Sequence, residues 1–93
     1  MSYRVRATTQ FRKDYRQLRK RGLDMSRLEA VVGMLASGTP LAPQYHDHPL
    51  SGDYAGFREC HVASDWLLIY SKRDDILILT LSRTGTHSDL FGK

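Results

Sequence analysis

The sequence has little of what would staple a small secreted domain together or place a chain in a membrane. It contains one cysteine, Cys60, in 93 residues, so no internal disulfide can form. No apolar run approaches the roughly 18 residues of a membrane-spanning helix, and no apolar stretch of a secretory signal follows the first residues. No proline-rich or serine-rich tract marks a linker. We therefore expect a single domain over residues 1–93, in the cytoplasm, with no membrane partner.

Signatures of several enzyme classes are also missing. The sequence has no glycine-rich phosphate loop, no G-x-S-x-G elbow and no Cys/His nucleophile arrangement. Cys60 directly precedes His61 on a predicted strand, where their side chains point to opposite faces. A zinc site built from His46, His48, His61 and Asp65 is an alternative, but it lacks cysteine partners and an H-E-x-x-H pattern. We expect no metal and no cofactor.

Positive charge is concentrated in the first half of the chain. Residues 1–40 contain nine Lys or Arg and three acids, a balance of +6, whereas residues 41–93 contain five and seven, a balance of −2. A polyanionic partner is the natural interpretation of such a basic half, and a solvated helix face without a partner is the alternative. The candidate residues for a surface that contacts nucleic acid or the ribosome are Arg12, Lys13, Arg16, Arg19 and Lys20.

Apolar periodicity predicts a strand and two helices in the first 40 residues. Residues 3–7 alternate as in a short strand, and a Thr8-Thr9 pair precedes a helix that runs to about residue 21. Asp24 or Ser26 can cap a second helix, with Ser26-x-x-Glu29 as a candidate capping box. The expected buried stripes are Phe11, Tyr15 and Leu18 on the first helix, and Met25, Leu28, Val32 and Leu35 on the second.

The second half of the chain predicts a loop followed by three strands. Residues 37–52 contain all three prolines and little periodicity, whereas segments 56–61, 66–71 and 76–82 resemble strands joined by short hairpins. The last two of these segments are apolar on both faces and should be interior strands. Thr86-x-x-Asp89 predicts a capping box that opens a last helical turn. The expected fold class is α+β: a small, mainly antiparallel sheet with the first strand at an edge, two N-terminal helices on one face and a short C-terminal helical turn.

Polar residues that the core does not use converge at one edge of the predicted sheet. His61 and Asp65 flank the turn between the first two strands of the meander. Arg83 leaves the third strand at the same edge, because alternate strands of a meander run parallel, and His87 and Phe91 follow within a few residues. His87 then lies in the first turn of a helix, where the dipole disfavours an imidazolium and leaves a neutral proton acceptor.

This set contains the parts needed to cleave RNA without a metal. One imidazole removes the proton from a 2′-hydroxyl, which attacks the adjacent phosphorus, and a second protonates the leaving 5′-oxygen. Arg83 meets the charge that grows on the phosphoryl oxygens. Trp66 and Phe91 offer flat surfaces for an unstacked base. Two alternatives stay open: Trp66 heads an apolar strand and can pack in the core, and Arg83 can pair with Asp89.

Three segments closely resemble the YafQ branch of the RelE/ParE toxin superfamily. They are residues 48–61 (HPLSGDYAGFRECH), residues 64–70 (SDWLLIY) and residues 83–91 (RTGTHSDLF). The similarity covers essentially the whole chain in order, and the C-terminal motifs are specific to the family whereas the N-terminal half is generic. The sequence departs from the family at the turn before Asp65, where Ala63 and Ser64 replace a frequent proline, and His46 lies outside the motif.

The resemblance implies a microbial ribonuclease fold of the RelE/ParE type and a toxin of a type II toxin–antitoxin pair. Such a toxin is an endoribonuclease that cuts mRNA in the decoding site of the ribosome, and a cognate antitoxin, which we expect to be acidic and to bind DNA, silences it. By the resemblance, the acid/base residues are His48, His61, Asp65 and His87, the phosphate-binding residue is Arg83, and the residues that hold the message are Trp66 and Phe91.

Two alternatives belong to other functional classes. A ParE-like relative on the same scaffold inhibits DNA gyrase by binding and has no nuclease chemistry, and the histidine set argues against it. A plain interaction module would bind RNA through the basic helices with salt-dependent affinity and no turnover.

Overall fold

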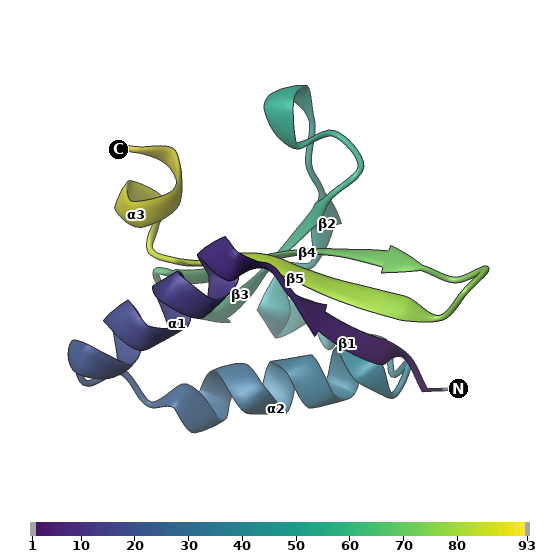
Figure 1. Cartoon of the computed structure of the whole chain (residues 1–93), viewed down its shortest axis with the longest axis horizontal. Helices are drawn as coiled ribbons and strands as arrows, with labels where there is room; N and C mark the ends of the chain where they lie inside the picture. The colour runs from purple at the N-terminus through teal and green to yellow at the C-terminus, as the bar shows by residue number, and fades with distance from the viewer. Residues whose placement is uncertain (1, 93) are drawn as a thin grey trace.

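A five-stranded, mostly antiparallel sheet organises the computed structural model, which describes residues 2–92 (Figure 1). The strand order is β1-β5-β4-β3-β2; β1 runs parallel to β5 and every other neighbouring pair is antiparallel. This confirms the α+β fold class, with the first strand at an edge of the sheet. The elements in chain order are β1 Arg4–Ala7, α1 Thr9–Lys20, α2 Met25–Ala36, η1 Pro43–Tyr45, β2 His48–Pro49, η2 Gly52–Tyr54, β3 Arg58–Ala63, β4 Trp66–Arg73, β5 Ile78–Gly85 and α3 His87–Phe91.

Strands β3 and β5 begin two residues later than the periodicity predicts, whereas β4 begins at Trp66 as predicted. Gly56 and Leu77 have φ angles of 93° and 53°, so both belong to the turns that precede β3 and β5. The predicted loop also contains the two-residue strand β2, which pairs with the start of β3. This short pairing places His48 on the sheet rather than in free loop.

Side-chain caps set where the two long helices begin. The Thr8 hydroxyl accepts a hydrogen bond from the Phe11 amide at 3.0 Å, as expected for α1. The Asp24 carboxylate accepts from the Ser26 amide at 3.1 Å and caps α2, so Ser26 lies inside the helix and the Ser26–Glu29 capping box does not form. Glu29 instead accepts a hydrogen bond from the Tyr15 hydroxyl at 3.1 Å, which ties α2 to α1.

The main core lies between the two long helices and one face of the sheet. Leu18 of α1, Leu28 of α2 and Leu68 of β4 are each at most 1% exposed within it. On α2 the buried valine is Val31 rather than the predicted Val32, because the helix presents the stripe 25-28-31-35 to the sheet. Cys60 is also buried there, opposite in direction to His61, as expected.

The other face of the sheet carries a much smaller apolar cluster. Its buried members are Leu67 and Ile69 of β4 and Leu90 of α3. In Figure 1, α2 runs below the sheet, whereas α3 and the loop around η2 stand above it. None of the helices between residues 2 and 92 is long and apolar enough to cross a bilayer. The upper face, with its small cluster, is therefore the face on which polar side chains find room.

Candidate active site

Cross-strand pairing aligns the candidate polar residues on the upper face. His48 of β2 pairs with Glu59 of β3, Glu59 pairs with Ile69 of β4, and Ile69 pairs with Arg83 of β5. Residues paired in this way share a face, with strands about 4.8 Å apart. One row across four strands thus carries an imidazole, a carboxylate and a guanidinium. His61 lies in the next row, opposite Leu67.

A bulge in β5 directs Arg83 to this row. Tyr70 pairs with Leu81 and Ile69 pairs with Arg83, so Ser82 is an extra residue on β5. Without it, strict alternation would place Arg83 on the same face as Leu81, which packs in the main core. The extra residue turns Arg83 to the upper face, and such re-aiming of a side chain is a typical use of a bulge beside a functional site.

Two of the candidate residues, His87 and Asp65, form a hydrogen-bonded pair. The Nδ1 atom of His87 lies 2.7 Å from Oδ1 of Asp65. Hydrogen bonds from His87 hold the pKa of Asp65 below its ordinary value. Because Asp65 is a carboxylate, Nδ1 must carry the shared proton, and Nε2 is left as the atom that exchanges protons with a substrate.

The capping of α3 places His87 in the first turn, as predicted. The Thr86 hydroxyl accepts from the Asp89 amide at 3.1 Å, while the Asp89 carboxylate accepts from the Thr86 amide at 2.9 Å. The preceding Gly85 has a φ of 155°, and a Cβ there would lie 2.9 Å from the Asp89 side chain. The Thr-Gly-Thr turn therefore needs glycine to bring α3 back over β5.

His61 lies at the centre of a group of imidazoles. Its ring centroid is 5.1 Å from that of His46 and 6.2 Å from that of His87. Burial, more than the neighbouring imidazoles, lowers the pKa of His61, while Glu59 opposes this shift. His61 is therefore neutral near pH 7 and can accept a proton. His46, which lies outside the family motif, therefore contacts the site through His61.

Glu59 links His48 to His61. Its Oε1 atom lies 3.4 Å from Nε2 of His48 and 3.8 Å from Nε2 of His61, and Glu59 is only 5% exposed. Sequence reasoning missed this carboxylate, although alternation places Glu59 and His61 on the same strand face. The three side chains offer ligand atoms within 4.8 Å of one another and could hold a divalent metal, a different set from the zinc alternative that included Asp65.

Arg83 has a partner that the sequence did not indicate. Its guanidinium forms two hydrogen bonds to Asp14 of α1, at 3.0 and 3.1 Å, and this pairing raises the pKa of Arg83. The predicted alternative partner, Asp89, instead pairs with Arg21 at 2.7 Å. The signal in the sequence was the position of Asp14 between Phe11 and Leu18, on the buried stripe of α1.

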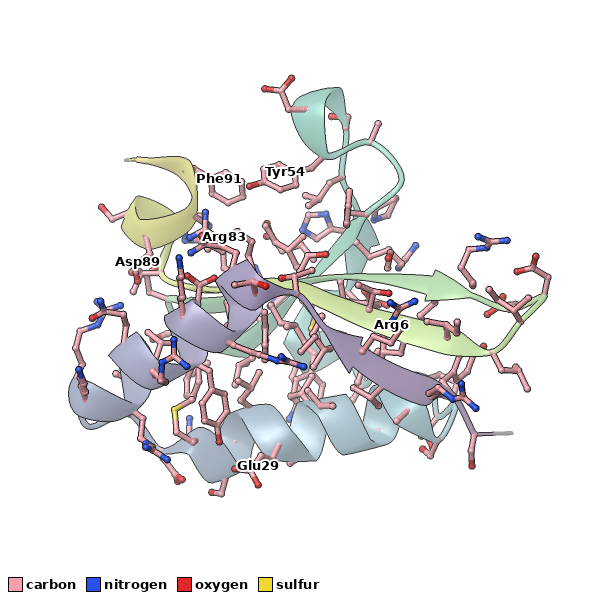
Figure 2. The ribbon with its side chains drawn as sticks, in the orientation of Figure 1. Arg6, Glu29, Tyr54, Arg83, Asp89 and Phe91 are labelled. Carbon is pink, nitrogen blue, oxygen red and sulfur yellow. The ribbon has the colours of Figure 1, made fainter. Side chains whose placement is uncertain are left out.

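The two aromatic residues predicted to hold a base lie in different environments. Trp66 is 4% exposed in the main core and donates its indole N–H to the Thr84 hydroxyl at 2.9 Å, so its ring is not a stacking surface. Phe91 is 37% exposed, and its ring meets that of Tyr54 edge-on at 5.8 Å. Figure 2 shows these two rings next to each other above Arg83. Tyr54, rather than Trp66, is thus the second aromatic ring beside Arg83.

An anchored loop brings His46 and His48 to the site. The Asp47 carboxylate between them accepts hydrogen bonds from the Tyr70 hydroxyl and from the Arg58 guanidinium. His46 itself has a φ of 49°, which a residue without this anchoring would seldom adopt. The pair of contacts therefore fixes where the two imidazoles lie relative to His61.

The basic side chains of α1 form an exposed surface next to Arg83. A cleft of about 540 Å³ separates α1 from the end of β5 and is lined by Lys13, Arg21 and Arg83, with Asp14 and Asp89. Of the five candidate bases, Lys13 is the one that lines this cleft. All five candidates are exposed: Arg12, Lys13, Arg16, Arg19 and Lys20.

Comparison with known proteins gives a consistent result along the chain. Residues 3–92 match the family model described as bacterial toxin of type II toxin–antitoxin system, YafQ. The mRNA interferase toxin YafQ of Escherichia coli K12 is 44% identical over 84 residues, which cover 89% of each chain. The crystal structure of YafQ from E. coli BL21(DE3) superposes with a TM-score of 0.91 at 40% identity, over 97% of this chain and 99% of that one. The toxin in a crystal structure of the E. coli DinJ–YafQ complex superposes with a TM-score of 0.88 at 40% identity, over 97% and 99% of the two chains.

Proposed function

This chain belongs to the YafQ family of bacterial type II toxin–antitoxin toxins, and from that premise we propose that it is an mRNA interferase that cleaves translated mRNA by metal-independent transesterification. The observation that supports this mechanism most strongly is the convergence of His61, the His87–Asp65 pair and Arg83 on one face of the sheet. These are a proton acceptor, a carboxylate-oriented imidazole and a permanent cation, which together meet the needs of phosphodiester cleavage.

Two imidazoles share the proton transfers. The lowered pKa of His61 favours its use as the base that removes the 2′-hydroxyl proton. Asp65 engages Nδ1 of His87 and so orients the ring, and we assign Nε2 the transfer of a proton to the leaving 5′-oxygen instead of the acceptor role expected from its place in the helix. The P–O bond to the 5′-oxygen breaks as the 2′-oxygen attacks, leaving a 2′,3′-cyclic phosphate and a 5′-hydroxyl. His48 supports His61 through the Glu59 carboxylate that lies between them.

Arg83 stabilises the charge of the transition state. The guanidinium is a fixed cation with several N–H donors, a geometry that suits phosphoryl oxygens. Because Arg83 lies beneath the Tyr54–Phe91 pair, a phosphate bound to it brings the adjoining base against an aromatic ring. Base stacking on such rings tolerates different sequences and holds the nucleotide while the phosphate reacts.

The ribosome and the antitoxin are the proposed macromolecular partners. Lys13 lines the cleft that contains Arg83, and the other candidate bases are exposed on the same helix, so α1 can contact ribosomal RNA while the site reaches the message. The same positive surface favours an acidic segment of a cognate, DNA-binding antitoxin, and the similar E. coli toxin is found in complex with DinJ. Titration with the cognate antitoxin of this chain should abolish mRNA cleavage. Undiminished cleavage in a saturated toxin–antitoxin complex would contradict this partnership.

End-group analysis of the cleaved message tests the proposed chemistry. We expect fragments with a 2′,3′-cyclic phosphate and a 5′-hydroxyl, formed at the same rate in the presence of EDTA. A 5′-phosphate product or loss of cleavage in EDTA would overturn the mechanism. The matched comparison uses the same transcript free and engaged by ribosomes, because ribosome dependence requires cleavage of the engaged transcript alone.

A further inference from the structure

Asp14 is an unusual residue for the helix on which it lies. The other charged side chains of α1 are basic and exposed, whereas the Asp14 side chain is 10% exposed and lies on the stripe that faces β5. A carboxylate in such a place is strongly destabilising unless donors surround it. The donors around Asp14 therefore indicate what it does.

Four hydrogen bonds converge on the Asp14 carboxylate. The Oδ2 atom accepts from Nε of Arg83 at 3.0 Å and from the amide of Thr84 at 3.2 Å. The Oδ1 atom accepts from Nη2 of Arg83 at 3.1 Å and from the side-chain amide of Gln10 at 3.0 Å. Both oxygens are thus used, and the guanidinium is held along one edge in a two-point contact that fixes its plane.

The same network is anchored in the core. Thr84, whose amide contacts Asp14, donates its hydroxyl to the Leu67 carbonyl at 2.8 Å and accepts the indole N–H of Trp66 at 2.9 Å. Thr84 is 1% exposed and Trp66 is 4% exposed. The Asp14 carboxylate is therefore tied, through Thr84, to buried groups of β4 and β5.

We propose that Asp14 is a positioning residue that presents the Arg83 guanidinium to the scissile phosphate. This inference rests on the proposed function of Arg83. Asp14 holds the edge formed by Nε and Nη2. The guanidinium also contacts the Tyr54 side chain, and its remaining N–H groups can reach phosphoryl oxygens. An arginine on a bulged strand end has several rotamers, and the carboxylate selects one of them before RNA arrives. Such preorganisation is what makes a cation effective in a transition state.

A double-mutant cycle tests this inference. Asp14→Asn keeps the size of the side chain and removes the charge that orients Arg83. We expect kcat to fall by about 10- to 100-fold, the effect of a small misplacement, while KM changes by less than about threefold. In the Arg83→Ala background, Asp14→Asn should have no further effect on kcat, because the group that Asp14 positions is gone.

The controls separate positioning from folding. Asp75→Asn removes another arginine-paired carboxylate, at the exposed β4–β5 turn, and should leave kcat unchanged. If Asp14→Asn does not fold, Asp14→Glu keeps the charge but moves it by one methylene, and kcat should again fall without a matching change in KM. If Asp14→Asn lowered kcat by the same factor in the wild-type and Arg83→Ala backgrounds, the inference would be overturned, because a merely structural residue acts independently of Arg83.

A second measurement needs no RNA. The Nε–H group of Arg83 should give an ordered, slowly exchanging NMR signal in the wild-type protein and a mobile, rapidly exchanging one in Asp14→Asn. An unchanged signal in that variant would contradict positioning even if cleavage declined. Absence of cleavage by the wild-type protein, with the NMR difference present, would count against the proposed function and leave the Asp14–Arg83 positioning supported.

Discussion

The two faces of the sheet differ in how the same strands use their side chains. Below the sheet, Leu68 and Tyr70 of β4 join a core that both long helices cover. Above it, Leu67 and Ile69 contribute to a cluster whose remaining buried residue is Leu90 of α3. Within residues 2–92 every buried side-chain nitrogen or oxygen has a hydrogen-bond partner. The lower face supplies most of the apolar burial, and the upper face carries the imidazoles.

This difference shows how so short a chain can combine a stable fold with a polar site. The helix-covered face holds the strands in register, so the upper face needs little apolar burial of its own. Substitutions on the two faces should therefore have separable consequences: loss of activity above the sheet and loss of stability below it. Arg83 and Asp14 connect the faces, because the upper-face arginine is paired with a carboxylate from the buried stripe of α1.

The substitution His87→Ala, on the upper face, should have the largest effect on mRNA cleavage. Removal of one general acid or base should lower the rate of mRNA cleavage by about 10²- to 10⁴-fold. The His87 side chain is 51% exposed, so the melting temperature should change little. Parallel assays of cleavage and thermal unfolding check this. Loss of stability in proportion to activity would mean that His87 is structural.

Leu68→Ala on the lower face should show the opposite pattern. Leu68 is 0% exposed in the main core, and truncation of such a leucine lowers the free energy of unfolding by about 2 to 5 kcal/mol. Below the melting transition, cleavage per folded molecule should stay close to the wild-type rate. Urea titration gives the stability, and a kcat that fell as far as in His87→Ala would show that the two faces are not separable.

Phe91→Ala should weaken the holding of RNA more than the fold. Phe91 is exposed and contacts Tyr54 and His87 through their rings. Loss of a stacked base costs about 1 to 3 kcal/mol, so the affinity for a single-stranded substrate should fall by roughly 5- to 150-fold. Fluorescence anisotropy with a labelled oligonucleotide measures this. Trp66→Phe is the matched comparison and should leave the affinity unchanged, because the Trp66 ring is buried.

Added Zn²⁺ should inhibit the enzyme. The cluster of His48, Glu59 and His61 presents ligand atoms close together, and a bound metal would occupy the imidazole lone pairs needed for proton transfer. We expect at least about tenfold inhibition at saturating Zn²⁺, reversed by EDTA. The inhibition should weaken at lower pH, because His48 and His61 bind zinc only as neutral imidazoles. Calorimetry should show that the His48→Ala variant binds Zn²⁺ about tenfold more weakly than the wild-type protein. Stimulation of mRNA cleavage by Zn²⁺ would contradict the metal-independent mechanism.

The smallest expected effect is on stability below neutral pH. Because the pKa of His61 is lower in the folded protein than its ordinary 6.5, the unfolded chain binds more protons as the pH falls from 7 to 5, and stability should decrease. His61→Gln should reduce this slope. The pKa of Asp65 is also lower in the folded protein, so Asp65 contributes in the same sense, but only around and below its ordinary 3.8. Urea titrations at several pH values test this, and an unchanged slope in His61→Gln would contradict the burial of His61.

Local sequence patterns predict the elements better than they predict the contacts of the site. The stripe of Phe11 and Leu18, the caps at Thr8 and Thr86, and the meander follow from periodicity and short-range hydrogen bonding. The family motifs supply His48, His61, Asp65, Arg83 and His87, and the structure places these residues along one face.

What sequence reasoning missed depends on long-range pairing. Asp14 meets Arg83 across 69 positions, and no local pattern contains that contact. The bulge at Ser82, which turns Arg83 upward, follows from the register between β4 and β5 rather than from the composition of β5. The resemblance implies that Trp66 holds RNA, whereas the apolar pattern of β4 predicts the core position that it occupies.

Attack by a 2′-hydroxyl is the central claim, and a single 2′-deoxynucleotide at the mapped cleavage position tests it most directly. A ribosome-bound message that carries this one substitution should remain intact, while the matched all-ribose message is cut to a 2′,3′-cyclic phosphate. Cleavage of the deoxy-substituted message at the same position and rate would contradict the mechanism, since no 2′-oxygen would be present to attack.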